Sequence, residues 1–118
     1  MFCGNMAINN FYNIYPYNIA ISDTNGIVEF DEPNYTKHDS FGSFSLIHDC
    51  IKEKSGLKHV VDMTTLDDFV EKYNIHKVDF LKIDVEGMDI QVLKGARKVI
   101  EKFKPYILIE FYLSLIHI

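Results

Sequence analysis

The chain has 118 residues, of which 47% are hydrophobic and 25% are charged, and its formal net charge is -5. This length suits one domain with a buried core, and the composition differs from that of disordered chains, which combine low hydrophobicity with high net charge. Residues 1–36 contain no Lys or Arg, and the bases and acids of the remainder are nearly balanced. The sequence therefore disfavours nucleic acid and anionic membranes as partners, because both attract basic surfaces.

The sequence also lacks the marks of export and of metal binding. The N-terminus has no signal-peptide pattern, and no apolar run approaches the roughly 20 residues of a membrane helix. Cys3 and Cys50 are too few for a disulfide framework or a zinc site, and the five histidines show no metal-ligand spacing. We therefore expect a soluble, cytoplasmic protein without a metal site made of cysteine or histidine.

The first half of the chain predicts the end of a helix and a hairpin. Residues 1–12 are compatible with the tail of a helix. Its inward-facing residues would be Met6, Ile8 and Phe11. Residues 14–22 and 27–30 predict two strands, and residues 23–26, Asp-Thr-Asn-Gly, are typical of the turn that joins a hairpin. Residues 31–59 predict loop with short strands.

The pattern becomes more regular after residue 60. Residues 60–63 predict an extended segment, and Thr65 can cap a helix with Asp68 three residues later, a variant of the capping box. Apolar residues then recur at the spacing of one helix face. These are Leu66, Phe69, Val70 and Tyr73.

The last part predicts a strand, a helix and a second strand. Residues 78–83 are apolar on nearly both sides, as in the buried strands of parallel sheets. Gly87 would open one helix over residues 88–103, Pro105 would end it, and residues 106–111 would form the next strand. The inward stripe of this helix would be Ile90, Leu93, Ala96 with Arg97, Ile100 and Phe103. A βαβ unit of this kind predicts an α/β fold with a mainly parallel sheet.

Acidic residues follow the strands at the end where such folds bind ligands. Asp84 and Glu86 come after the first of these strands and directly precede Gly87, and Glu110 ends the last one. Such carboxylates can hold a divalent metal, accept a proton from a hydroxyl group or bind a hydroxylated ligand. A structural role is open for each: Asp84 satisfying backbone amides, Glu86 favouring the start of the helix, and Glu110 packing on a loop.

Four blocks in order resemble the C-terminal half of the FkbM family of S-adenosylmethionine-dependent methyltransferases. They are Thr65 to Asp68, Val78 to Gly87, Val92 to Ala96, and Pro105 with Ile107 to Glu110. Weaker similarity lies upstream, at Asn5, Asn9, Asn18 to Asp23, Gly26 and Gly42 to Leu46. Asp89 departs from the family pattern, which usually has a glutamate there.

The resemblance implies a Rossmann-like class I methyltransferase fold with helices on the faces of its sheet. It implies transfer of the methyl group of S-adenosylmethionine to a hydroxyl oxygen of a sugar, polyketide or similar small metabolite. Asp84 would then orient or deprotonate the acceptor hydroxyl, and Glu86 would shape the same loop. Asn18, Ala20 and Ile21 would lie near the adenine of the cofactor, although plain strand packing is the alternative for Ile21.

Parts that this class of enzyme needs do not occur in the sequence. No G-x-G run for the cofactor is present, and the first two strands of the fold have no counterpart. We therefore expect residues 1–112 to form a partial methyltransferase domain that is inactive alone. Residues 113–118 match a translated sequencing adapter and would be a non-native tail, with a genuine short extension of the strand as the alternative. The alternatives are a non-catalytic α/β fragment that binds a partner chain through its sheet edge, and another nucleotide-utilising Rossmann enzyme.

Overall fold

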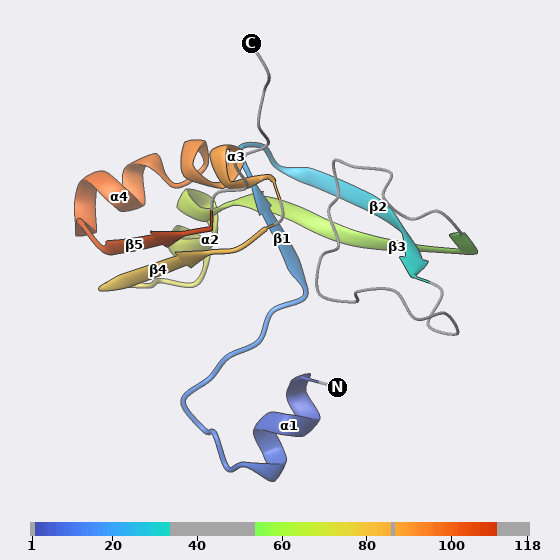
Figure 1. The fold of residues 1–118 in the computed structure, drawn as a ribbon. Coiled ribbons are helices and arrows are strands. Elements are labelled where there is room, and N and C mark those ends of the chain that lie inside the picture. The colour runs from blue at the N-terminus through green and yellow to red at the C-terminus, as the bar shows by residue number, and fades with distance from the viewer. Residues whose placement is uncertain (1, 34–53, 86, 111–118) are drawn as a thin grey trace.

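The structure, a computed structural model, describes residues 2–33, 54–85 and 87–110 (Figure 1). This part of the chain contains both helices and strands, which confirms the α/β class but not a regular alternation. In chain order they are α1 (Phe2–Ile8), β1 (Ile19–Ser22), β2 (Gly26–Pro33), β3 (Lys54–Thr65), α2 (Leu66–Lys72), β4 (Phe80–Ile83), α3 (Asp89–Lys94), α4 (Arg97–Phe103) and β5 (Tyr106–Ile109). The strands form two separate sheets.

The larger sheet has the strand order β1-β3-β2. β1 pairs with β3 in parallel, with Ile19 opposite Asp62, and β2 pairs with β3 antiparallel, with Ile27 opposite the same residue. The predicted hairpin between β1 and β2 is therefore wrong, because β3 lies between these two strands and uses both of its edges. This sheet is mixed, whereas a mainly parallel sheet was predicted.

The smaller sheet contains β4 and β5, which are parallel, with Phe80 opposite Tyr106 and Ile83 opposite Ile109. α3 and α4 connect the two strands, so the βαβ order expected from the sequence is present. Ile83 is only 2% exposed, whereas Phe80 is 58% exposed. The prediction that this strand is buried on both sides is therefore wrong, because the described residues cover only one face of it.

The single helix predicted over residues 88–103 is broken into α3 and α4 at Gly95 and Ala96. Gly95 passes so close to the end of β1 that an added Cβ would lie 2.0 Å from the Ser22 carbonyl oxygen. The break also changes the buried face. Ala96 is buried as expected, but its buried companions are Val92 and Val99, while Ile90 is 57% exposed.

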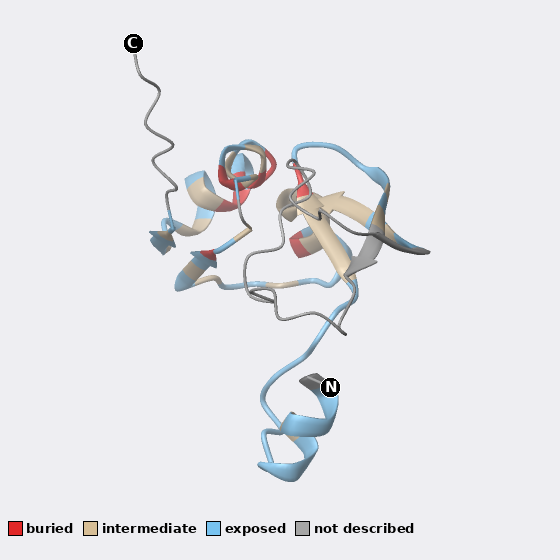
Figure 2. Ribbon diagram, turned by 45° about the vertical axis from the view of Figure 1, so that its right-hand side comes forward, coloured by how far each residue is buried: buried red, intermediate tan, exposed pale blue. Residues whose placement is uncertain are grey.

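The core is small and gathers where these helices and α2 meet the strands (Figure 2). Its buried apolar residues are Val70, Ile83, Val92, Ala96 and Val99. α1 stands apart from this core in both ribbon views. Met6 is half-buried, but Ile8 is 78% and Phe11 53% exposed, so these two do not face inward as predicted. None of the described helices is long and apolar enough to cross a membrane.

Candidate functional site

Asp84 follows the last residue of β4 and forms an ion pair with Lys82 on the same strand. The Lys82 Nζ and Asp84 Oδ2 atoms are 2.8 Å apart, and both side chains are exposed. Side chains two residues apart on a strand share one face of the sheet. The pair therefore lies on the uncovered face of β4, at its carboxyl end.

Glu110 completes this group from the neighbouring strand. Its backbone N–H donates to the carbonyl oxygen of Ile83 at 3.3 Å, which continues the parallel pairing of β4 and β5 by one residue. Asp84 and Glu110 therefore end adjacent strands side by side. We call Lys82, Asp84 and Glu110 the polar cluster.

Lys82 and the carboxylates of the polar cluster stabilise each other's charged forms. The pKa of Asp84 is lowered, mainly by the hydrogen bond that Lys82 donates and by the positive charge of that ammonium group, with a smaller lowering from Glu110. The pKa of Lys82 is raised by the same hydrogen bond, by the charge of Asp84 and, to a lesser extent, by that of Glu110. Asp84 is therefore ionised at neutral pH and able to accept a hydrogen bond from a hydroxyl group.

Glu86, the second acid predicted for this site, lies outside the described residues, and its role stays a prediction. Gly87 directly follows it and has a φ of 95°, in the left-handed region that favours glycine. This conformation turns the chain sharply between β4 and α3. The glycine predicted to open the helix thus serves the turn, and α3 begins at Asp89 with Met88 as its N-cap residue.

The residues predicted to contact the cofactor lie in the other sheet. Asn18 is exposed just before β1, and the half-buried Ala20 and Ile21 lie in β1, opposite Met63 and Thr64 of β3. The structure does not bring them into the same sheet as Asp84. Their part in cofactor binding stays a prediction.

Lys82 is the functional candidate that the sequence analysis missed. Its signal was the spacing Lys-x-Asp at the end of a strand, which places both side chains on one face. A second pair of the same kind occurs at the other end of β4, where Lys77 Nζ lies 2.9 Å from Asp79 Oδ1. Only the pair at the carboxyl end adjoins a second carboxylate from β5.

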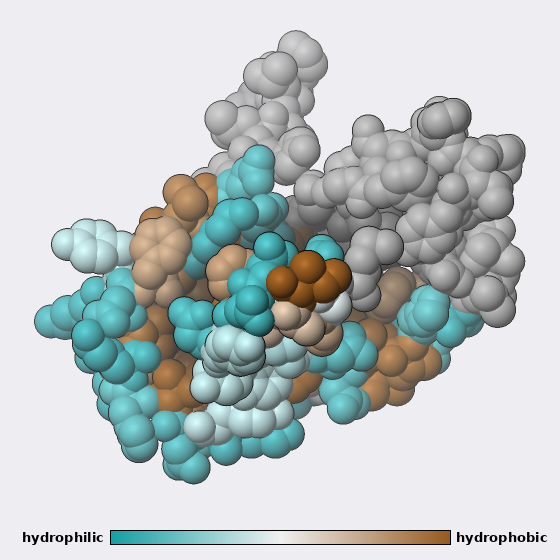
Figure 3. Space-filling view, turned by 90° about the horizontal axis from the view of Figure 1, so that it is seen from below, coloured by the Kyte–Doolittle hydropathy of each residue, from teal (hydrophilic) through white to brown (hydrophobic). Residues whose placement is uncertain are grey.

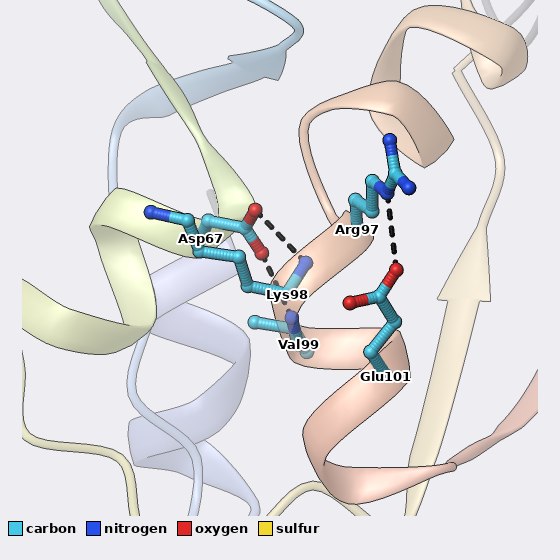
Figure 4. Close-up of polar contacts among 5 residues, drawn as sticks. All are labelled: Asp67, Arg97, Lys98, Val99 and Glu101. Carbon is cyan, nitrogen blue, oxygen red and sulfur yellow. Dashed lines mark hydrogen bonds and ion pairs between the residues drawn. The ribbon is translucent and has the colours of Figure 1, made fainter.

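Asp67 belongs to one of the family blocks, but its contacts are structural (Figure 4). Its carboxylate accepts hydrogen bonds from the backbone N–H groups of Lys98 at 3.0 Å and Val99 at 2.9 Å. Its own N–H donates to the Gly95 carbonyl oxygen at 2.9 Å. Ala96, the N-cap residue of α4, has no polar side chain, so Asp67 caps α4 from a different helix.

The predicted cap of α2 is confirmed in part. Thr65 Oγ1 accepts from the Asp68 N–H at 3.0 Å, but Asp68 does not complete the capping box. Asn25, from the turn after β1, takes the place of Asp68 at the Thr65 backbone: its Oδ1 accepts a hydrogen bond from the Thr65 N–H at 3.2 Å. The Nδ2 of Asn25 also donates a hydrogen bond to Asp68 Oδ2 at 2.6 Å. The Asn25 hydrogen bond is the main cause of a lowered pKa at Asp68.

Two buried oxygen atoms on α3 have no hydrogen-bond partner within the described residues. They are Asp89 Oδ1 and Gln91 Oε1. Asp89, the position that departs from the family pattern, is 5% exposed. Among the described side chains, no group of three or more His, Cys, Asp or Glu residues is placed to hold a metal ion.

Comparison with protein families decides the family. The profile of the methyltransferase FkbM domain matches residues 3–116, nearly the whole chain. The chain belongs to the FkbM methyltransferase family. This confirms the prediction made from the sequence blocks and supports methyltransferase activity at the level of the family. Searches of curated proteins and of solved structures found no match.

Proposed function

We propose that this chain is the acceptor-binding part of an S-adenosylmethionine-dependent O-methyltransferase. Its acceptor would be a hydroxyl group of a sugar, a polyketide or a similar small metabolite. The observation that supports this best is the polar cluster at the carboxyl ends of β4 and β5, in a chain of the FkbM family. In α/β proteins this edge of the sheet is where ligands bind.

The chemistry of methyl transfer assigns a role to each member of the polar cluster. The bound cofactor supplies a methyl group on a positively charged sulfur. Asp84 would orient the acceptor hydroxyl toward that methyl group and take up the hydroxyl proton as the oxygen is methylated. Because its pKa is lowered, Asp84 acts first as a hydrogen-bond acceptor that aims the oxygen. Lys82 holds this carboxylate in position through its ion pair, and Glu110 places a second carboxylate at the end of the neighbouring strand.

The residues assigned to the cofactor have suitable chemistry. The exposed amide of Asn18 can hydrogen-bond the edge of an adenine ring, and Ala20 and Ile21 can supply apolar contact. Glu86 would shape the loop that follows Asp84. These described residues supply few polar groups for a cofactor, so we propose that further strands, from an upstream segment or another chain, complete the donor site.

The test of Asp84 uses the natural protein extended by any reading frame upstream of this chain. Transfer of radiolabelled methyl groups from S-adenosylmethionine to a panel of sugars and polyols should fall at least 100-fold in Asp84→Asn. Asp79→Asn is the matched control, because Asp79 pairs with Lys77 at the other end of the same strand. Equal rates in Asp84→Asn and the wild-type protein would remove Asp84 from the site.

A calorimetric titration of the 118-residue chain by itself tests the incomplete donor site. We expect no measurable affinity for S-adenosylmethionine. Binding at micromolar concentration would contradict the proposal that further strands are needed, and it would leave the assignment of Asp84 to the activity assay.

A second candidate function is binding of a partner chain through the sheet edges. Within the described residues, β1 pairs only with β3 and β4 only with β5, so each keeps a free edge. Free edges present unpaired N–H and C=O groups that can pair with another strand.

Hydrogen exchange distinguishes this second candidate. The amides of β1 and β4 should exchange fast in the chain alone and become protected when the upstream segment is co-expressed with it. If their exchange is unchanged in that complex, no strand pairs with these edges. Protection without methyl transfer would favour the binding function over catalysis.

A further inference from the structure

The N-terminal arm, which we define as residues 2–16, contains no charged residue. Residues 3–16 are all exposed except the half-buried Met6. The exposed aromatic side chains of the arm are Phe11 at 53%, Tyr12 at 82% and Tyr15 at 74%. A helix as short as α1 is unstable in water without tertiary contacts. The arm therefore has the composition of a segment that packs against another surface.

The base of the arm is held in place by Tyr17. Its ring lies 5.0 Å from that of Phe69 on α2 in an edge-on arrangement, and 4.6 Å from that of Tyr73, the C-cap residue of the same helix. From this anchor the chain runs away from both sheets, and α1 stands apart from them in two views (Figures 1 and 2). The arm thus projects beyond its own chain from a fixed point.

The second unpartnered surface is one side of the β4–β5 sheet. We define the bare face as Phe80, Lys82, Tyr106 and Leu108, which alternate with the residues on the covered side. Phe80 is 58%, Tyr106 82% and Leu108 53% exposed. Seen from below, apolar residues lie among hydrophilic ones on the side of the molecule where β4 and β5 lie (Figure 3). Parallel strands are normally covered on both faces.

We propose that the N-terminal arm of one copy of this chain packs on the bare face of a second copy, and that the exchange is reciprocal. A two-fold dimer results, in which each copy provides one arm and one face. The arm brings no charge that would be buried without a partner. Lys82 is already paired with Asp84, so its ammonium group can stay at the rim of the contact.

The size of the contact suits a stable dimer. Aromatic side chains bury roughly 150 to 250 Å² each. The dimer has two such contacts. Each contact contains three aromatic residues of the arm and three large side chains of the bare face. The surface area buried in both contacts together then reaches the roughly 1,200 to 2,000 Å² of a specific interface.

Sedimentation velocity of the full chain over a range of concentrations is the first test. We expect a monomer–dimer equilibrium that Tyr12→Ser with Tyr15→Ser weakens at least tenfold. These residues lie outside the core, so the variant should keep its circular dichroism spectrum. Ile27→Asn is the control, because Ile27 is 62% exposed on β2, away from both surfaces. A wild-type chain that stays monomeric, or an equal effect of Ile27→Asn, would overturn the proposal.

Cross-linking between two differently marked chains tests which copy supplies the arm. Both chains carry Cys50→Ser. The first chain keeps the exposed Cys3 of α1 as its cysteine. The second chain carries Cys3→Ser and Tyr106→Cys, so its cysteine lies on the bare face. A short bismaleimide should join them at least tenfold faster than when Ile27→Cys replaces Tyr106→Cys. Equal rates would overturn the exchange. A further chain carries both Cys3 and Tyr106→Cys. If this chain forms cross-links only within one molecule at every protein concentration, the exchange is also overturned.

Discussion

Two regions of the molecule have aspartates close to the start of a helix. One is the contact of α2 with α4, and the other is the carboxyl end of β4. The aspartates of these two regions have different surroundings. Asp67 accepts two backbone hydrogen bonds from α4, and Asp68 is held by Asn25 and Thr65. Asp84 accepts a bond from Lys82, on the open face of the sheet. The first region uses its carboxylates to join elements, whereas the second leaves them available to a ligand.

This difference matters because both regions belong to blocks that resemble the FkbM family. An aspartate in a family block need not belong to the reaction site. The hydrogen bonds that a carboxylate accepts from elements distant in the sequence separate the two roles, and the sequence does not reveal these bonds. Four substitutions test how the first region is held together and whether Asp84 is free of such a structural role. They follow in order of decreasing expected effect on stability.

Gly95→Ala should have the largest effect. Its methyl group would lie 2.0 Å from the Ser22 carbonyl oxygen, so α3 or β1 has to move. We expect a loss of about 2 to 3 kcal/mol in the free energy of unfolding, measured with urea. Gly4→Ala is the control, since nothing lies within 4 Å of its added Cβ. A Gly95→Ala variant as stable as the wild-type chain would show that the helices do not pack on β1 as described.

Asp67→Ala should come second. It leaves the N–H groups of Lys98 and Val99 without their acceptor, and loss of a capping side chain costs about 1 kcal/mol. The same urea titration measures it. Glu71→Ala, at an exposed position on the same helix, should change the midpoint little. If both variants behave alike, the cap is not what joins α2 to α4.

The hydrogen bond between Asn25 and Asp68 should appear in the pH dependence of stability. The pKa of Asp68 is lowered in the folded chain, so its contribution is full above the unfolded value of about 4 and is lost as the pH falls through the folded value. Asn25→Ala removes the main cause of the shift. Thermal melts between pH 7 and pH 2 should show a smaller loss at acid pH in this variant. An unchanged profile would mean that another group controls the acid transition.

Asp84→Asn should have the smallest effect on stability. The side chain is exposed and its partner Lys82 is on the same strand, so the urea midpoint should match that of the wild-type chain and of Asp79→Asn. The change in activity should be large in comparison. A clear loss of stability in Asp84→Asn alone would assign this carboxylate to the fold rather than to the acceptor.

Much of the local structure could be predicted from the sequence. Thr65 caps α2, a strand precedes Asp84, and β5 follows Pro105, because capping groups, apolar runs and proline act over a few residues. The family could also be read from blocks of the sequence, and the match to residues 3–116 confirms it. The position of Asp84 at the end of a strand follows from the same local pattern.

Contacts between distant segments were decided only by the tertiary structure. Nothing near residue 25 indicates that β3 separates β1 from β2, or that Asn25 completes the cap of a helix about 40 residues later. Periodicity predicted one helix over residues 88–103, but the helix is broken at Gly95, where the chain lies close to Ser22. Val92 and Val99 are buried there, whereas the predicted Ile90 is exposed. The sequence alone determined the family, the local elements and the acid at the end of β4. Strand order, the break in the helix and the split between structural and available carboxylates depend on which surfaces meet, and local preferences do not encode that.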